Sequence, residues 1–306
     1  MSEKVFRDTR IQIGILRSRG VVIKSSKRAK DIIRRTNYYN LINGYKDPFL
    51  QAKTPNEKYL PGTTIEEIYA LYEFDRKLRI LTLEYILEIE KHIKSVVSYC
   101  FSKEHGHRDY LKVDNFDTYG DKKYEQAYNL ISRLYKNVAD NIKKEPSVEH
   151  YVNGKNYIPL WVIVNTISMG DISKFYSSML PKERSDVARR VKYGVMQEDL
   201  KSYLFFLSAI RNRCAHDERL FSYLSYVGIP NNTYLKYFRI RKVKSNYFAL
   251  ITIFKILLPR NRYSNYHDQL DILLKELNSQ LKVIPPKVIR NMMGMPEKWR
   301  RLKGLL

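Results

Sequence analysis

The chain has few cysteines and no long apolar run, so it lacks the sequence features of disulfide scaffolds, zinc sites and membrane spans. Only Cys100 and Cys214 occur in 306 residues, which excludes a disulfide framework and a cysteine-built metal site. The longest apolar stretches, such as 249–258, are interrupted and too short to span a bilayer. The N-terminus has no apolar run of signal-peptide length. These absences predict a cytoplasmic protein with no membrane partner and no metal or other cofactor.

Acidic residues are also scarce. The chain has 55 Lys and Arg against 32 Asp and Glu, which gives a net charge of +23 at pH 7. An excess of that size repels itself in the folded protein, so a polyanionic partner is the natural explanation. The charge balance therefore predicts a nucleic-acid partner. Coding bias or an anionic surface is the alternative.

Glycine is scarce, with 12 residues. Apolar residues recur at helical spacing along nearly the whole chain. The clearest helix follows Thr64 and Glu67, whose spacing forms a capping box, and continues to about Lys103. One stripe along it is expected to be buried: Ile68, Leu71, Tyr72, Leu78, Leu81, Tyr85, Ile89, Ile93, Val96 and Val97. The pattern predicts an all-α helical bundle with this helix, about 63–103, as its spine.

Other helices are expected on both sides of the spine. Their expected ranges are about 9–19, 26 towards Tyr38, 122–142, 160 onward, 171–179, 181–194, 199–216, 245–258 and 266–281. Asn43-Gly44-Tyr45 is expected to break the chain, and Pro285-Pro286 to end its regular part. With no internal repeat or clear linker, we predict a single helical domain over residues 1–306. It would have an N-terminal extension of about 1–60, a core of about 61–225 and a basic C-terminal helical region of about 226–306.

The chain contains no acidic residue between Glu218 and Asp268, a window rich in cations and tyrosines, and the segment up to Arg35 is similarly basic. Cations meet phosphates while aromatic rings stack on unpaired bases, so this mixture suits single-stranded RNA. We therefore predict RNA contacts at Arg213, Arg219, Lys236, Arg239, Arg241, Lys242, Lys244, Arg260, Arg262 and Tyr237. The alternative is that the tyrosines are core residues and the lysines only solvate helix faces.

The strongest candidate for chemistry is Arg211, Asn212 and His216. Histidine can give or take a proton near neutral pH, and the planar fork of arginine matches phosphate oxygens. Together they can cleave RNA without a metal: the 2′-hydroxyl attacks its own phosphate, histidine moves the proton and arginine stabilises the developing charge. Asn212 lies one helical turn before His216 and could orient the imidazole. The alternative is a structural arginine and an ordinary surface histidine.

Helical geometry sets a condition on this site. Leu200, Leu204, Leu207 and Arg211 share one helical face, so the leucines would pack and deliver Arg211 at the end of their stripe. In a straight helix Arg211 and His216 would diverge by more than a quarter-turn. The site therefore needs the helix to end or loosen near Ala215, or Arg211 to reach around. Arg260, Arg262 and His267 repeat the spacing and form a weaker second candidate.

The segment Arg211–Phe221 resembles the signature of the Abi-like proteins, a bacterial abortive-infection family within the HEPN superfamily of ribonucleases. Three earlier blocks resemble the same family in the same order. They are Tyr38–Tyr45 with Pro48-Phe49, Leu71–Arg79, and Pro159-Leu160-Trp161 with Met169–Ser173. The similarity covers roughly residues 9–280. Asp217 departs from it, because that position is often histidine.

The resemblance implies a helical HEPN fold and a toxin-like, metal-independent endoribonuclease in antiviral defence. Arg211, Asn212 and His216 fill the family's motif. A homodimer that brings two motifs together, and a small noncoding RNA as a partner, are also implied. A non-catalytic protein that forms a ribonucleoprotein with one structured RNA remains the alternative, and a module that docks on proteins or membranes is the third possibility.

Overall fold

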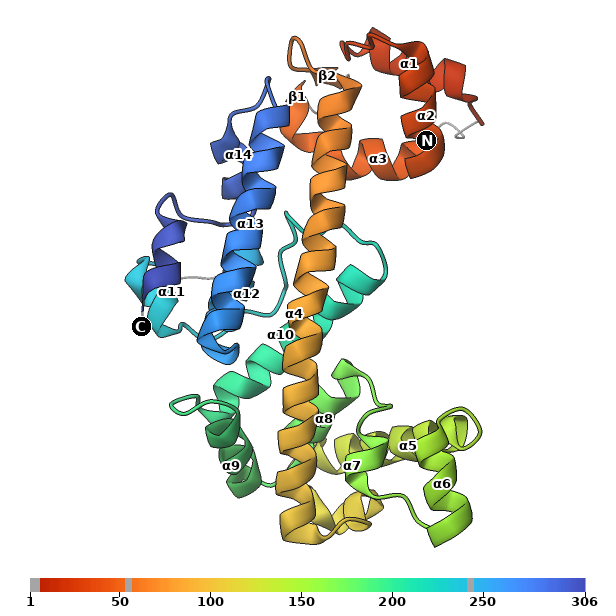
Figure 1. Ribbon diagram of the computed structural model, residues 1–306, viewed down its shortest axis with the longest axis vertical. Helices are drawn as coiled ribbons and strands as arrows, with labels where there is room; N and C mark the ends of the chain where they lie inside the picture. The colour runs from red at the N-terminus through yellow and green to blue at the C-terminus, as the bar shows by residue number, and fades with distance from the viewer. Residues whose placement is uncertain (1–5, 53–56, 241–244, 306) are drawn as a thin grey trace. The chain divides into compact units, whose positions relative to one another are not determined.

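The computed structural model describes residues 6–52, 57–240 and 245–305 (Figure 1). As the sequence predicts, the fold is all-α with one long helix, α4 (Ile65–His105). The chain forms two compact units. Unit 1 contains the residues up to Leu81, Asp217–Tyr223 and the residues from Ser264 onward, and unit 2 contains Thr82–His216 and Leu224–Tyr263. The helices α4 and α13 (Arg260–Gln280) contribute residues to both units.

Unit 1 contains short helices and one small hairpin besides its parts of α4 and α13. These elements are α1 (Thr9–Ser18), α2 (Ser26–Thr36), α3 (Tyr38–Tyr45), β1 (Leu50–Ala52), β2 (Lys58–Tyr59), α14 (Pro286–Met292) and the 3-10 helices Asp47–Phe49 and Trp299–Gly304. The hairpin is antiparallel, with Leu50 opposite Tyr59, and the sequence pattern did not show it.

Side-chain caps explain where the first helices begin and end. Asp8 accepts a hydrogen bond from the backbone N–H of Ile11 (2.8 Å), and Ser25 accepts one from Arg28 (3.2 Å), so both helices begin at capped residues. Gly20, with φ of 96°, follows the end of α1 as predicted. The expected continuation of α2 to Tyr38 was wrong, because Asn37 has φ of 63° and its side chain caps α3 instead.

The chain break expected at Asn43-Gly44-Tyr45 was also misplaced. Helix α3 continues through these residues to Tyr45, and its cap residue Lys46 leads directly into the 3-10 helix Asp47–Phe49, which contains Pro48. The reason is packing, because Tyr45 is buried and holds the last turn of the helix against its neighbours. A glycine inside a helix costs about 1 kcal/mol relative to alanine, which such burial can offset.

The capping box at the start of α4 forms as predicted. The backbone N–H of Glu67 donates to Thr64 Oγ1 and that of Thr64 donates to Glu67 Oε2, both at 3.2 Å. The other carboxylate oxygen of Glu67 accepts the backbone N–H groups of Lys282 (2.7 Å) and Val283 (2.9 Å), just after α13. One buried carboxylate therefore begins the long helix and also ties the chain end of α13 to it.

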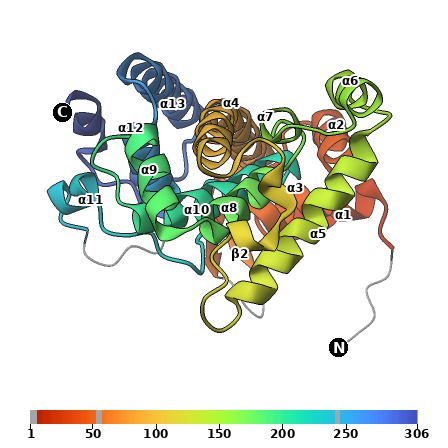
Figure 2. The same cartoon turned by 90° about the horizontal axis from the view of Figure 1, so that it is seen from below.

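Within unit 1, α13 lies alongside the first part of α4 (Figures 1 and 2), and Lys77 pairs with Glu276 at 2.7 Å. The prediction that regular structure ends at Pro285-Pro286 was wrong. Pro286 is the first residue of α14, a position where proline fits because its missing N–H would have no helical partner. The 3-10 helix after α14 buries Trp299 completely.

All regular secondary structure among the described residues of unit 2 is helical. Beside the rest of α4 it contains α5 (Lys123–Asn141), α6 (Pro146–Lys155), α7 (Leu160–Ile163), α8 (Met169–Ser178), α9 (Pro181–Val191), α10 (Gln197–Ala215), α11 (Thr233–Tyr237), α12 (Tyr247–Leu257) and the 3-10 helices Asp109–Leu111 and Val113–Asn115. The sequence missed α6 and α11. The bounds of α5, α8, α9, α10 and α12 lie within about three residues of the expected ranges.

Helices α8 and α10 pack closely in unit 2, and α5 lies against α8 (Figure 2). Gly170 on α8 makes the close approach possible, because a Cβ at this position would lie 3.3 Å from Ser208 Oγ on α10. In the part of the chain that the structure describes, no helix is both long enough and apolar enough to cross a membrane.

Candidate active site

Helix α10 carries the predicted catalytic residues in its last turns. Leu200, Leu204 and Leu207 are fully buried, as their spacing predicts, and they fix the orientation of the helix in unit 2. Arg211 follows on the same stripe and is half-buried, with one-third of its side chain exposed (33%). The leucine stripe therefore leads to an arginine whose Nε is buried although one-third of its side chain is exposed.

The acidic partner of Arg211 comes from α4. Glu90 Oε2 lies 3.8 Å from Arg211 Nε, and Glu90 Oε1 lies 2.7 Å from Lys94 Nζ one turn further along α4. Glu90 and Lys94 are both buried. Within the described residues, Glu90 Oε2 and Arg211 Nε have no hydrogen-bond partner, so the contact between these two atoms is an ion pair without a hydrogen bond.

This arrangement leaves positive charge at the site. One carboxylate faces two cations, Lys94 and Arg211, so the cluster of Glu90, Lys94 and Arg211 has a net charge of +1. A phosphate group at the exposed edge of Arg211 would complete the pairing. Two other carboxylates of α4, Glu84 and Glu88, pair with Arg262 instead, at 3.3 and 2.7 Å.

His216 lies where the helix ends. The spacing of Arg211 and His216 required the helix to end or loosen near Ala215, and it does. The last helical residue of α10 is Ala215, and the backbone N–H of His216 donates to the carbonyl of Asn212 at 2.9 Å. The following residue, Asp217, has φ of 57° and turns the chain away from the helix. Asn212 and His216 are exposed, and no hydrogen bond or ion pair joins either side chain to another described residue.

The chain after His216 is held in unit 1 by a buried carboxylate that the sequence did not single out. Asp75 of α4 accepts the backbone N–H groups of Phe221 (2.7 Å) and Leu220 (3.1 Å) and the hydroxyl of Tyr45 (2.9 Å). It also pairs with Arg79 at 2.6 Å. Burial raises the pKa of the Asp75 carboxyl, and Arg79 with the two backbone groups opposes that rise.

Further contacts surround the Asp75 carboxylate. Arg79 also pairs with Asp217, so the residue directly after His216 is bound to the same network. The Phe221 ring stacks on Tyr45 with centroids 6.1 Å apart. Arg219 donates to the carbonyl of Gly44 at 2.7 Å and faces Asp47 at 3.5 Å. Residues from the Tyr38–Tyr45 block, the Leu71–Arg79 block and the end of the motif segment therefore meet here.

The predicted RNA-binding residues have different environments. In unit 2, Lys236, Arg239, Arg260 and Tyr237 are exposed, Arg213 is half-buried, and Arg262 faces Glu84 and Glu88 and lies over the Tyr85 ring at 5.0 Å. Lys236 and Arg239 line a small hollow of about 450 Å³. In unit 1, Arg219 is half-buried and engaged as described. Arg241, Lys242 and Lys244 lie outside the described residues.

The second arginine–histidine cluster contains no exposed histidine. His267 is 3% exposed and its ring lies 4.6 Å from that of Trp299. Burial lowers the pKa of His267 to about 4, so the imidazole is neutral at physiological pH. Two tyrosines of the acid-free window, Tyr247 and Tyr263, are likewise core residues, whereas Tyr226 and Tyr237 are exposed.

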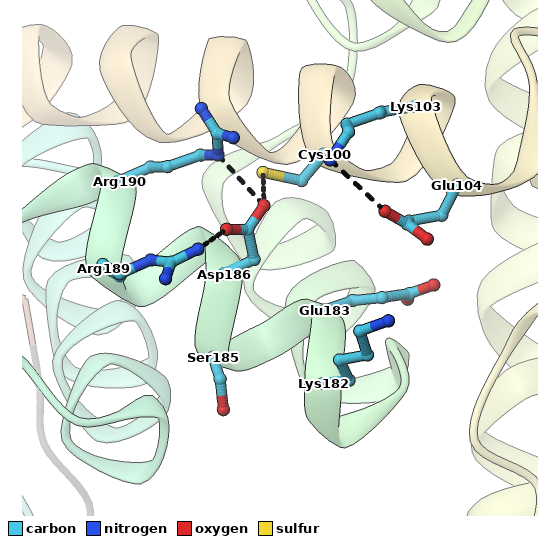
Figure 3. Close-up of a pocket in the computed structure, with 9 residues that line it drawn as sticks. All are labelled: Cys100, Lys103, Glu104, Lys182, Glu183, Ser185, Asp186, Arg189 and Arg190. Atoms are coloured by element: carbon cyan, nitrogen blue, oxygen red, sulfur yellow. Dashed lines mark hydrogen bonds and ion pairs between the residues drawn. The ribbon is translucent and has the colours of Figure 1, made fainter.

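A pocket with charged lining lies elsewhere in unit 2, between the end of α4 and α9 (Figure 3). It has a volume of about 470 Å³, and its charged side chains are largely engaged with one another. Arg189 (2.5 Å) and Arg190 (3.0 Å) donate to Asp186 and lower its pKa to about 2. Burial raises the pKa of the Cys100 thiol to about 12, so Cys100 is not a nucleophile at neutral pH.

Two histidines near this pocket, His105 and His107, also have protein partners. His105 hydrogen-bonds to Glu183, and His107 accepts a hydrogen bond from Arg108 at 3.1 Å beside the rings of Tyr157 and Trp161. In the described ranges, no three His, Cys, Asp or Glu side chains converge as a set of metal ligands.

Comparison with known proteins places these residues in a family. No curated protein and no solved structure matches the chain. A family model described as Abi-like protein matches residues 31–222, and this range contains Asp75, Arg79, Glu90, Arg211 and His216. The match covers well over half of the sequence, so the chain belongs to the Abi-like protein family and is an abortive-infection-related protein.

Proposed function

We propose that this protein is a metal-independent endoribonuclease of the HEPN type that acts in abortive-infection defence. The observation that carries the proposal is the end of α10. Arg211 is anchored by Glu90 in the last turns of the helix, and the helix stops at Ala215 so that His216 is exposed at its C-terminus. An exposed imidazole five residues after a partly exposed arginine, in a strongly basic protein, suits cleavage of an RNA phosphodiester.

The three residues would divide the reaction between them. His216 would take the proton of the attacking 2′-hydroxyl or donate one to the leaving 5′-oxygen, and Arg211 would stabilise the charge on the phosphate. Asn212 would bind a phosphate oxygen or orient the imidazole. The products would be a 2′,3′-cyclic phosphate and a free 5′-hydroxyl, because the attacking oxygen belongs to the RNA itself.

One motif supplies a single titrating group, whereas the reaction uses both a base and an acid. A two-fold homodimer with both His216 side chains at one phosphate would supply the pair. A small noncoding RNA bound to the basic surface would then hold the enzyme inactive or direct it to its target.

The test compares His216→Ala and Arg211→Ala with a matched control, His150→Ala, which removes an exposed histidine of α6. We expect both motif variants to lose cleavage of total RNA in EDTA while they retain RNA binding, and the control to cleave normally. Equal cleavage by His216→Ala would refute the assignment. Binding without cleavage by the wild-type protein would favour the ribonucleoprotein alternative, and one discrete RNA that co-purifies would identify its partner.

A further inference from the structure

Helix α2 presents a basic face that the proposed catalytic site does not use. Its sequence places five cations on the side opposite its buried residues: Lys27, Arg28, Lys30, Arg34 and Arg35. At 100° per residue these five lie within about 160° of the helix circumference. Lys30 is half-buried and the other four are exposed. The single acidic residue of the helix, Asp31, is exposed on the same face, which leaves the face a net charge of +4.

Among the described residues, these cations have no acidic side chain within ion-pair distance. By contrast, nearby cations of unit 1 such as Arg19 and Lys46 share Glu57, and Arg76 pairs with Glu73 at 2.9 Å. Helix α1 adds Arg17, whose guanidinium group donates to Ser26 Oγ at the start of α2 (2.9 Å).

The helix's own stability does not explain two of these residues. Arg34 and Arg35 lie in the last turn, where a cation complements the helix dipole. Lys27 and Arg28 lie in the first turn, which has no acidic residue, and there a cation opposes the dipole. Lys27 and Arg28 therefore slightly destabilise the helix, and an anionic partner would explain their presence there.

The opposite face of α2 decides which polyanion fits. Ala29, Ile32, Ile33 and Thr36 are buried in unit 1. An amphipathic helix that binds a membrane inserts its apolar face between lipids, and this apolar face is already occupied by protein. What remains for a partner is charge alone, and this suits the phosphate backbone of an RNA, which is bound without insertion and without reading bases.

We propose that the exposed face of α2, with Lys27 and Arg28 at its N-terminal end, is a docking surface for the phosphate backbone of RNA. The inference rests on the proposed function only in that RNA is the ligand of this protein. It assigns affinity to a surface in unit 1 that is distinct from Arg211, Asn212 and His216 in unit 2. Loss of this surface weakens binding equally for RNAs of different sequence.

The experiment measures the salt dependence of RNA affinity by fluorescence anisotropy, with a labelled RNA hairpin in the His216→Ala background so that the RNA stays intact. The test variant is Lys27→Gln/Arg28→Gln. The control, Arg76→Gln/Arg300→Gln, removes the same net charge from a half-buried and an exposed arginine that Glu73 and Asp271 already neutralise. Each lost phosphate contact lowers the slope of log K against log salt by about 0.7–0.9.

We expect the test variant to lose about 1.4–1.8 from the slope, which at about 0.1 M salt is roughly a 25- to 60-fold loss of affinity. Its melting temperature should be unchanged or higher, since the helix dipole is relieved, and the control should bind as the parent does. The proposal is overturned if the test variant has the same slope as the parent. It is also overturned if the test variant loses binding to phosphatidylserine vesicles while its RNA affinity stays intact. If the parent itself binds no RNA, the proposed function and the docking surface both fail. If the parent binds RNA and the test variant has the same slope, only the docking surface fails.

Discussion

The buried carboxylate of Glu90 offers a test that separates stability from catalysis. It pairs with Lys94 at 2.7 Å and faces Arg211 at 3.8 Å. Removing one partner of a buried ion pair costs about 3–5 kcal/mol, because it leaves an uncompensated buried charge. Glu90 and Lys94 are 8% and 11% exposed, so this magnitude applies to their pair. Arg211 is one-third exposed and its pair is long, so its share is below about 1 kcal/mol.

The two partners of Glu90 therefore predict two different effects of Glu90→Gln. The loss of stability comes mainly through Lys94, and the loss of cleavage comes through Arg211, whose guanidinium group is no longer held. Adding Lys94→Met removes the stranded cation, so the double variant should recover most of the stability. It should not recover cleavage, which we expect to remain about 10- to 100-fold below wild type, because a small misplacement of a catalytic group has an effect of that size.

The assays are urea unfolding and cleavage of a labelled RNA at saturating protein, with Glu125→Gln on α5 as an exposed control. A Glu90→Gln variant that loses less than about 1 kcal/mol would show that the Glu90–Lys94 pair is not buried in solution. A double variant that regains both stability and cleavage would refute the positioning of Arg211 by Glu90, since the defect would then come from instability alone.

Three other predictions concern the scaffold. Asp75→Asn should lower the free energy of unfolding by about 3–5 kcal/mol in urea, because it leaves the buried Arg79 with a weakened partner; a loss under about 1 kcal/mol would contradict this. Leu204→Ala should cost about 2–5 kcal/mol by the same measurement, because the side chain is fully buried, and a surface-like effect below about 1 kcal/mol would exclude the packing described. Unfolded histidine takes up its proton near pH 6.5, but His267 in the folded protein does so only near pH 4. Its neutral form therefore stabilises the fold fully above pH 6.5, and up to about 3 kcal/mol is lost as the pH falls towards 4. His267→Phe should show a correspondingly shallower decline over that range, and parallel curves for the two proteins would refute the assignment.

Helical periodicity was sufficient to predict α4 and α10, because each carries a long apolar stripe and a recognisable end. Eight of the ten stripe residues expected on α4 are buried, and the other two, Tyr72 and Val96, are half-buried. The predicted range of α10, about 199–216, ends one residue from its observed last residue, Ala215. The β1–β2 hairpin and α14 were missed because short elements have too few residues for a period, and prolines are compatible both with a helix start and with a chain end.

The acidic partner of Arg211 could not be predicted from the sequence. Glu88 and Glu90 differ by two positions, which places them about 200° apart around α4. Which of them faces α10 depends on the rotation of one packed helix against another, and a single sequence does not contain that information. In the folded protein Glu84 and Glu88 share a face and pair with Arg262, while Glu90 on the other face pairs with Arg211.

The family resemblance extends beyond the motif because its other blocks support the chain on either side of the motif. In unit 2, Gly170 of the Met169–Ser173 block lets α8 approach the middle of α10, the helix that ends in the motif. In unit 1, Tyr45 and Asp75 belong to the two earlier blocks, and together with Arg79 they bind the backbone and side chains of residues 217–221. A solvent-exposed histidine can react reproducibly only if the backbone that carries it is fixed. Within unit 1 the contacts around Asp75 hold the backbone of residues 217–221, and within unit 2 the packing at Gly170 holds the helix that carries the motif, so substitutions at either place should impair any chemistry of the motif without touching its side chains.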